Sequence, residues 1–106
     1  MKKYKIELPI YYGRITLLIS KNLNFDTNHY LNINISEGIE AYSYKKKEHN
    51  YIIGIKKDVE LYNIVHEIVH IVNFIYEDHG IKLSKSNDEH QAYLTGYLFN
   101  EIFKLL

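Results

Sequence analysis

The sequence predicts an α+β fold in which a small N-terminal, mainly antiparallel sheet is followed by two C-terminal helices that pack together. Two observations predict it. Apolar and polar residues alternate through most of the first half, which is the period of a strand. Beyond residue 58 the apolar residues recur every three to four positions, which is the period of a helix. The length of 106 residues fits a single domain that covers residues 1–106.

The first two strands are expected at residues 4–8 and 15–19, where apolar side chains alternate with polar ones. Pro9 would end the first strand, because proline has no N–H for a sheet hydrogen bond. Tyr12-Gly13 lies where the chain would turn between the two strands. These features together predict an N-terminal β-hairpin.

The middle of the chain is expected to hold a second hairpin. Residues 21–30 are polar and are expected to be irregular, whereas residues 31–35 alternate leucine or isoleucine with asparagine and favour a short strand. Residues 39–44 and 51–55 are typical of two paired strands around the polar loop 45–50. The three lysines of that loop are expected to be solvated.

Two helices are expected to complete the chain. The segment from Val59 to Glu77 holds too many apolar residues for one narrow stripe, so this helix should be largely buried. Asp58 is its expected N-cap, and Gly80 is the expected stop after it. The second helix is expected at about residues 87–105.

The composition excludes several classes of protein. Thirteen basic and thirteen acidic residues give a net charge of zero, which argues against broad nucleic-acid binding. There is no run of about 18 apolar residues and no secretory signal, so neither a membrane span nor export is expected. Alanine is rare while lysine, isoleucine and asparagine are abundant, which is typical of an AT-rich bacterium or its phage. We therefore expect a protein of the cytoplasm of a bacterial host cell.

The strongest candidate site is the segment His66-Glu67-Ile68-Val69-His70. Two residues four apart on a helix lie about 40° apart on one face, so both imidazoles can bind one ion at roughly 2.1 Å. Glu67 would lie beside that ion, where a carboxylate can take a proton from a water on the metal. The competing interpretation is a pair of core histidines bonded to backbone or tyrosine hydroxyls. An unpaired imidazole is costly in so apolar a helix, which favours the metal.

A third ligand must be His, Asp or Glu, because the chain has no cysteine. Glu89 is the favoured candidate. It shares one face of the second helix with Ala92 and Gly96, and such small residues would let this helix approach the metal helix closely. Asp88 and His90 are adjacent alternatives.

Other roles compete for these residues. Ser86 with Glu89 three positions later also has the pattern of a capping box, and one carboxylate cannot easily serve both a helix terminus and an ion. The ligand role of Glu89 is favoured, because a capping box does not explain why Ala92 and Gly96 are small. Tyr93 is a possible donor to a transition-state oxyanion, although packing is the favoured role for any one of 11 tyrosines. His29 and His49 lie in polar segments and are expected to be solvated.

The His-Glu-x-x-His segment at 66–70 and the Glu-x-x-Ala-Tyr segment at 89–93 resemble the gluzincin pattern of zinc metallopeptidases. The nearest likeness is to small phage and prophage proteins of this zincin-like kind, and it covers about residues 39–100. The resemblance implies a bound Zn2+ with His66, His70 and Glu89 as ligands. It implies Glu67 as the general base.

The leading hypothesis is therefore a zinc-dependent metallopeptidase that hydrolyses peptide bonds, with an edge strand near residues 39–44 pairing with an extended peptide or protein substrate. The alternative is a binding or inhibitor protein of a phage or mobile element that holds a host protein partner. Its zinc would be structural or vestigial, as the small size of the chain suggests. A third possibility is a domain without metal.

Overall fold

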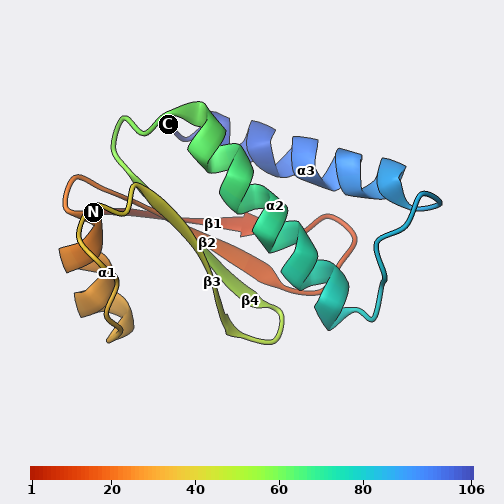
Figure 1. Cartoon of the computed structure of the whole chain (residues 1–106), viewed down its shortest axis with the longest axis horizontal. Helices are drawn as coiled ribbons and strands as arrows, with labels where there is room; N and C mark the ends of the chain where they lie inside the picture. Colours follow the sequence, from red (N-terminus) through yellow and green to blue (C-terminus); the bar gives the residue numbers. More distant parts are fainter.

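The computed structural model describes residues 1–106 as a four-stranded mixed sheet and three helices (Figure 1). The strand order is β1-β2-β4-β3, with β1–β2 and β3–β4 antiparallel and β2–β4 parallel. The α+β prediction is confirmed, including the two C-terminal helices that pack together. The parallel β2–β4 pair makes the sheet mixed. The elements are β1 (Lys2–Glu7), β2 (Arg14–Ser20), α1 (Leu23–Leu31), β3 (Ala41–Lys47), β4 (Asn50–Lys56), α2 (Leu61–Asp78) and α3 (Asp88–Phe103).

The main core lies between one face of the sheet and the two C-terminal helices. Strand β4 is central and its residues 51–55 are all buried, as expected for a strand covered on both faces. Helices α2 and α3 cover the same face, with α2 next to β3 in Figure 1. The side chains that fill this layer include Ile15, Leu17, Tyr51, Ile53, Ile55, Ile64, Ile68, Ile71, Val72, Ile75, Leu94, Leu98 and Ile102. None of the three helices has the length and apolar content needed to cross a membrane.

Helix α1 covers part of the opposite face of the sheet. The hydroxyls of Thr27 on α1 and Tyr42 on β3 lie 3.0 Å apart in a hydrogen bond. Tyr42 pairs with Gly54 of β4, so both lie on the face opposite Ile53 and Ile55. A Cβ at position 54 would overlap the Tyr42 ring, which is the reason that this strand needs glycine there.

Replacing Gly54 by alanine is expected to lower the free energy of unfolding by about 1–3 kcal/mol, because Tyr42 must move and lose its bond to Thr27. The matched control is Gly96→Ala on α3, where a Cβ would meet nothing within 4 Å. That change is expected to raise the free energy of unfolding by about 0.5–1 kcal/mol. Urea unfolding measures both. Equal stability of Gly54→Ala and the wild type would contradict the close packing of the Tyr42 ring on residue 54.

Residues 21–40 differ from expectation. The polar segment 21–30 was expected to be irregular, but Leu23–Leu31 forms α1. The reason is that Leu23 and Thr27, one turn apart, are buried against the sheet and stabilise an otherwise polar helix. Residues 31–35 do not form the expected strand. Instead Asn28 pairs with the backbone of Ile35, its Oδ1 accepting from the Ile35 N–H at 2.7 Å, and so fixes a loop.

The ends of α2 are partly as expected. Asp58 is not the N-cap: it has a φ of 64°, and Glu60 occupies the cap position. The expected stop is confirmed, because His79 is the C-cap and Gly80 follows with a φ of 67°.

The expected loop at residues 45–50 is wrong, because the turn between β3 and β4 is shorter. Strands β3 and β4 continue to Lys47 and from Asn50, so only two residues form the turn.

Candidate metal centre

His66 and His70 lie side by side on the outer face of α2. Their Nε2 atoms are 3.2 Å apart and their ring planes cross at 75°. Both residues are exposed, so the expectation that this helix is buried on most sides is wrong for the turns that carry them. The core contacts of α2 come from the opposite face, through residues such as Ile64, Ile68 and Ile71. Water can form hydrogen bonds with both imidazoles, so the argument that a buried, unpaired imidazole needs a metal does not apply to them.

The histidine pair nevertheless fits a metal ion. Two nitrogens bound to one tetrahedral zinc at roughly 2.0–2.1 Å lie about 3.4 Å from each other. The observed 3.2 Å between the Nε2 atoms is close to this value. The same separation also suits one N–H···N hydrogen bond between the rings. His66 and His70 are therefore two side chains that could hold zinc with little rearrangement.

Glu67 points to the sheet beside the histidines. Its Oε1 accepts a hydrogen bond from the Ser43 hydroxyl at 2.9 Å, and Ser43 lies on the edge strand β3. Sequence reasoning did not single out Ser43, because the two residues are 24 positions apart and no local pattern joins them. The bond fixes the direction of the carboxylate while leaving its second oxygen free. The direction of the Glu67 carboxylate is therefore fixed by β3, the strand at the edge of the sheet.

The predicted third ligand does not lie with the histidines. Glu89 is exposed in the first turn of α3, and no group of three or more His, Asp or Glu residues in the chain is placed to hold an ion. The expectation that Ala92 and Gly96 pack against α2 is wrong, because both are exposed. Helix α3 instead packs through Leu94, Leu98 and Ile102. Glu89 as a ligand therefore stays a prediction.

The other candidates on α3 also face solvent. Asp88 and His90 are exposed, and Tyr93 is 76% accessible. The predicted capping box is not formed either, since Asn87 occupies the N-cap position and no side chain caps the helix. Asn87 instead accepts from the Ser84 N–H through its Oδ1 at 2.9 Å and closes the loop before α3. The capping role of Glu89 is therefore wrong, and its role as a metal ligand stays a prediction.

A second polar centre, which sequence reasoning missed, lies at the end of α2. The Asp78 side chain is only 5% exposed, and its carboxylate accepts hydrogen bonds from Lys45 Nζ, from the Tyr51 hydroxyl at 2.6 Å and from the His49 N–H at 3.1 Å. The expectation that Lys45 is solvated is therefore wrong. Burial acts to raise the pKa of Asp78, but its three hydrogen bonds outweigh burial and lower that pKa to about 2.

His49 is not solvated as expected. Its ring packs edge-on against His79 and Tyr12, with ring centroids at 4.8 and 5.2 Å. Its backbone also joins three elements: the N–H donates to Asp78, and the carbonyl accepts from the Arg14 N–H at 3.0 Å. His79, the C-cap of α2, donates from Nδ1 to the Ile75 carbonyl at 2.8 Å. This cluster fixes the turns around the end of α2.

No protein-family model, curated protein or solved structure matches this chain. Its function is therefore inferred from the geometry of the histidine pair, Glu67 and the surfaces beside them.

Proposed function

We propose that the protein is a small zinc-dependent metallopeptidase of the zincin-like class. The proposal rests on the arrangement of three side chains on α2, those of His66, Glu67 and His70. Two imidazole nitrogens lie 3.2 Å apart, and the carboxylate between them in sequence is held by Ser43. Peptidase chemistry needs these elements: ligands for an ion and an adjacent base. The third ligand would be Glu89, after a movement of the first turn of α3.

Each side chain has a defined task in this proposal. His66 and His70 would hold the ion through Nε2. A bound zinc ion supplies Lewis-acid chemistry, because it lowers the pKa of a water and polarises a carbonyl. Glu67 would take a proton from the attacking water through its free oxygen and pass it to the leaving amine. The Ser43 hydroxyl would keep that carboxylate in position throughout.

The edge strand β3 would bind the substrate. It is the last strand of the sheet, so one row of its backbone N–H and C=O groups has no partner strand. An extended peptide can pair with such an edge by backbone hydrogen bonds alone. Because Ser43 lies on β3 and touches Glu67, a peptide paired there would run beside the histidines. An extended segment of unfolded protein is the substrate class that this arrangement favours.

Zinc-loaded protein is expected to cleave members of a peptide library, and Glu67→Gln is expected to lower the cleavage rate by about 100-fold. Glutamine keeps an oxygen for the Ser43 hydroxyl, so the fold and zinc content should not change. Ser43→Ala, which removes only the positioning bond, should cost less than Glu67→Gln. Mass spectrometry of the library gives the rates. A zinc-bound protein that cuts nothing, or a Glu67→Gln variant that cuts as fast, would refute a peptidase.

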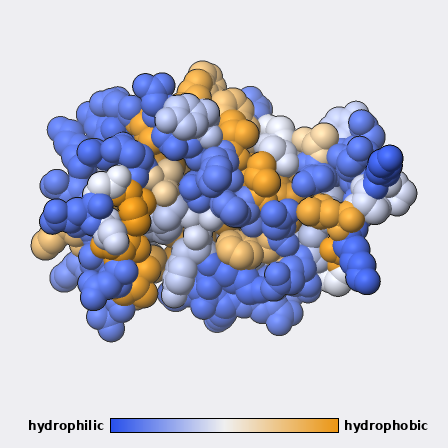
Figure 2. All heavy atoms as spheres, in the orientation of Figure 1, coloured by the Kyte–Doolittle hydropathy of each residue, from blue (hydrophilic) through white to orange (hydrophobic).

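A second candidate is a binding protein that holds a protein partner, and one observation favours it. Tyr62, Val65 and Val69 are exposed on α2 beside the histidines, with accessible fractions of 71%, 38% and 39%. Figure 2 shows apolar side chains along the line of α2 in a mostly hydrophilic surface. A stable partner recovered from host lysate and retained by Glu67→Gln, but lost with Val69→Asp, would favour this function over catalysis.

A further inference from the structure

A cavity lies outside the ends of the two parallel strands, away from the histidine pair. Strands β2 and β4 end side by side, with Ser20 paired to Lys56. From there the chain enters α1 after β2 and α2 after β4, and these helices cover opposite faces of the sheet. Neighbouring parallel strands whose connections leave to opposite faces open a crevice between them, and ligands of α/β proteins bind in such crevices.

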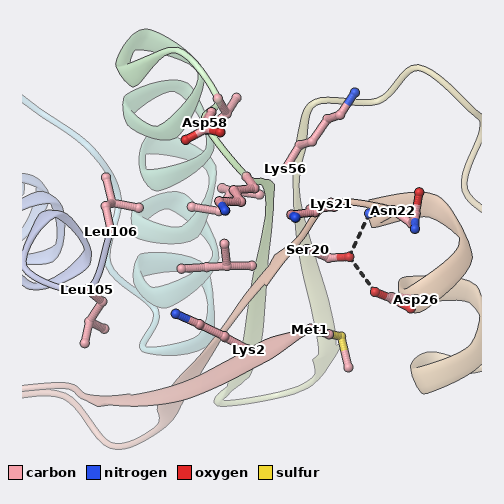
Figure 3. A pocket seen from close by; sticks show the side chains of 14 residues that line it. Met1, Lys2, Ser20, Lys21, Asn22, Asp26, Lys56, Asp58, Leu105 and Leu106 are labelled. Carbon is pink, nitrogen blue, oxygen red and sulfur yellow. Dashed lines mark hydrogen bonds between the residues drawn. The ribbon is translucent and has the colours of Figure 1, made fainter.

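The crevice in this protein is a cavity of about 610 Å³, a size in the range of small-molecule sites. In Figure 3 the labelled residues surround it from separate parts of the chain: Lys2 from β1, Lys21 before α1, Asp58 before α2, and Leu106 after α3. These positions are far apart in sequence. The cavity is therefore built by the tertiary fold.

The charge of the lining favours an anion. Four lysines contribute to it against two aspartates, Asp26 and Asp58. Asp26 already accepts a hydrogen bond from the Ser20 hydroxyl. Helix α1 begins directly after the lining residue Asn22 and has no side-chain cap, so its free N–H groups add partial positive charge. The lysines are Lys2, Lys21, Lys56 and Lys57.

Apart from Ser20 and Asn22, the rest of the lining is apolar. Ile19 and Ile55 come from the two parallel strands, Val59 from the loop before α2, and Leu105 and Leu106 from the end of the chain. An apolar wall beside a cationic rim suits a ligand that is apolar at one end and anionic at the other. A fully hydrated ion such as free phosphate would leave this wall without a contact.

We propose that this cavity binds a small amphipathic anion, that is, a carboxylate or phosphate group carried on an apolar body. The anionic group would lie among the lysines at the ends of β2 and β4, and the apolar body would lie against Val59 and Leu105. This site is independent of the proposed peptidase site, because it shares no residue with it.

Titration of 15N-labelled protein with octanoate tests the proposal. We expect saturable shifts of the amide signals of Ser20–Asn22 and Lys57–Val59, and no such shifts with 1-octanol, which has the same chain length without the charge. The double variant Lys21→Glu and Lys57→Glu is expected to raise the Kd for octanoate by about tenfold or more. The matched control is Lys82→Glu with Lys85→Glu, which makes the same change in net charge in the loop before α3. Its Kd is expected to equal that of the wild type.

The same titration with octyl phosphate and with adenosine monophosphate identifies the source of the anion. Tighter binding of the alkyl compound indicates a lipid-derived ligand, and tighter binding of the nucleotide indicates a nucleotide; both support the site. Three results would overturn it: no saturation by any of the three anions, equal shifts with 1-octanol, or equal weakening by both lysine pairs. None of these depends on zinc or on peptide cleavage, so this proposal and the peptidase proposal can fail separately.

Discussion

Replacing Asp78 by alanine is expected to lower the free energy of unfolding by about 3 kcal/mol. The change removes one buried carboxylate but leaves its three donors behind. The Tyr51 hydroxyl and the His49 N–H would lose their acceptor inside the protein, and Lys45 would lose its closest opposite charge. Because these donors belong to β3, β4 and the turn between them, the hairpin would lose its polar contacts with the end of α2.

The matched control is Glu77→Ala. Glu77 also lies near Lys45, at 3.4 Å, but 73% of its side chain is exposed. An exposed ion pair of this kind contributes little, so the control should change the free energy of unfolding by about 0.5 kcal/mol or less. Urea unfolding at pH 7 compares the two. Equal effects of both substitutions would show that the hydrogen bonds of Asp78 contribute no more than a surface charge.

Asp78 also gives stability a defined dependence on pH. Its pKa is about 2 in the folded protein and about 3.9 in an unfolded chain. A group whose pKa is lowered by folding stabilises the protein above its unfolded pKa, and that contribution is lost as the pH falls towards the folded pKa. The wild type should therefore lose stability between about pH 4 and pH 2. Asp78→Asn should show a smaller loss over the same interval.

Zinc is expected to bind at about one ion per chain, and His70→Ala is expected to weaken that binding by about 100- to 1,000-fold. Zinc sites have a total binding free energy of about 10–16 kcal/mol shared by four ligands, which gives roughly 2.5–4 kcal/mol for each. His66→Ala should have a similar effect, because the two Nε2 atoms are equivalent in the pair. Competition with a chromophoric chelator measures the affinities.

His29→Ala is the matched control, since His29 is an exposed histidine on a different helix. Its zinc affinity should equal that of the wild type. Glu89→Ala tests the third ligand separately: loss of affinity would mean that the start of α3 moves to the metal, and no change would leave two protein ligands. If zinc binds no better to the wild type than to the double variant lacking both histidines, α2 carries no metal centre.

The parts of the fold that could be predicted from sequence are those whose signal is local. Alternation identified the strands at 4–8, 15–19 and 51–55, and the helical period identified α2 and α3. Helix α1 could not be found in this way, because only Leu23 and Thr27 of its nine residues are buried. Its stability comes from the sheet beneath it, which the local sequence does not describe.

In the candidate site, too, only the features with a local sequence signal could be predicted. The spacing of His66 and His70 fixes their proximity as soon as the helix forms, so the pair was predictable. The placement of Glu89 depends instead on which face of α3 packs on α2, and the apolar Leu94, Leu98 and Ile102 determine that face rather than the small residues. Ser43 and Asp78 carry no local signal, because their partners are on other elements.

The parallel pairing of β2 with β4 has a consequence for how the chain folds. Each hairpin closes a short loop and can form by itself within microseconds. The β2–β4 ladder joins residues 36 apart in sequence, such as Arg14 and Asn50 (50 − 14), so its loop-closure entropy must be overcome before its contacts stabilise anything. We therefore expect the joining of the two hairpins to be slower than the formation of either hairpin. The core of α2 and α3 contacts is complete only after that step, because it spans both β2 and β4.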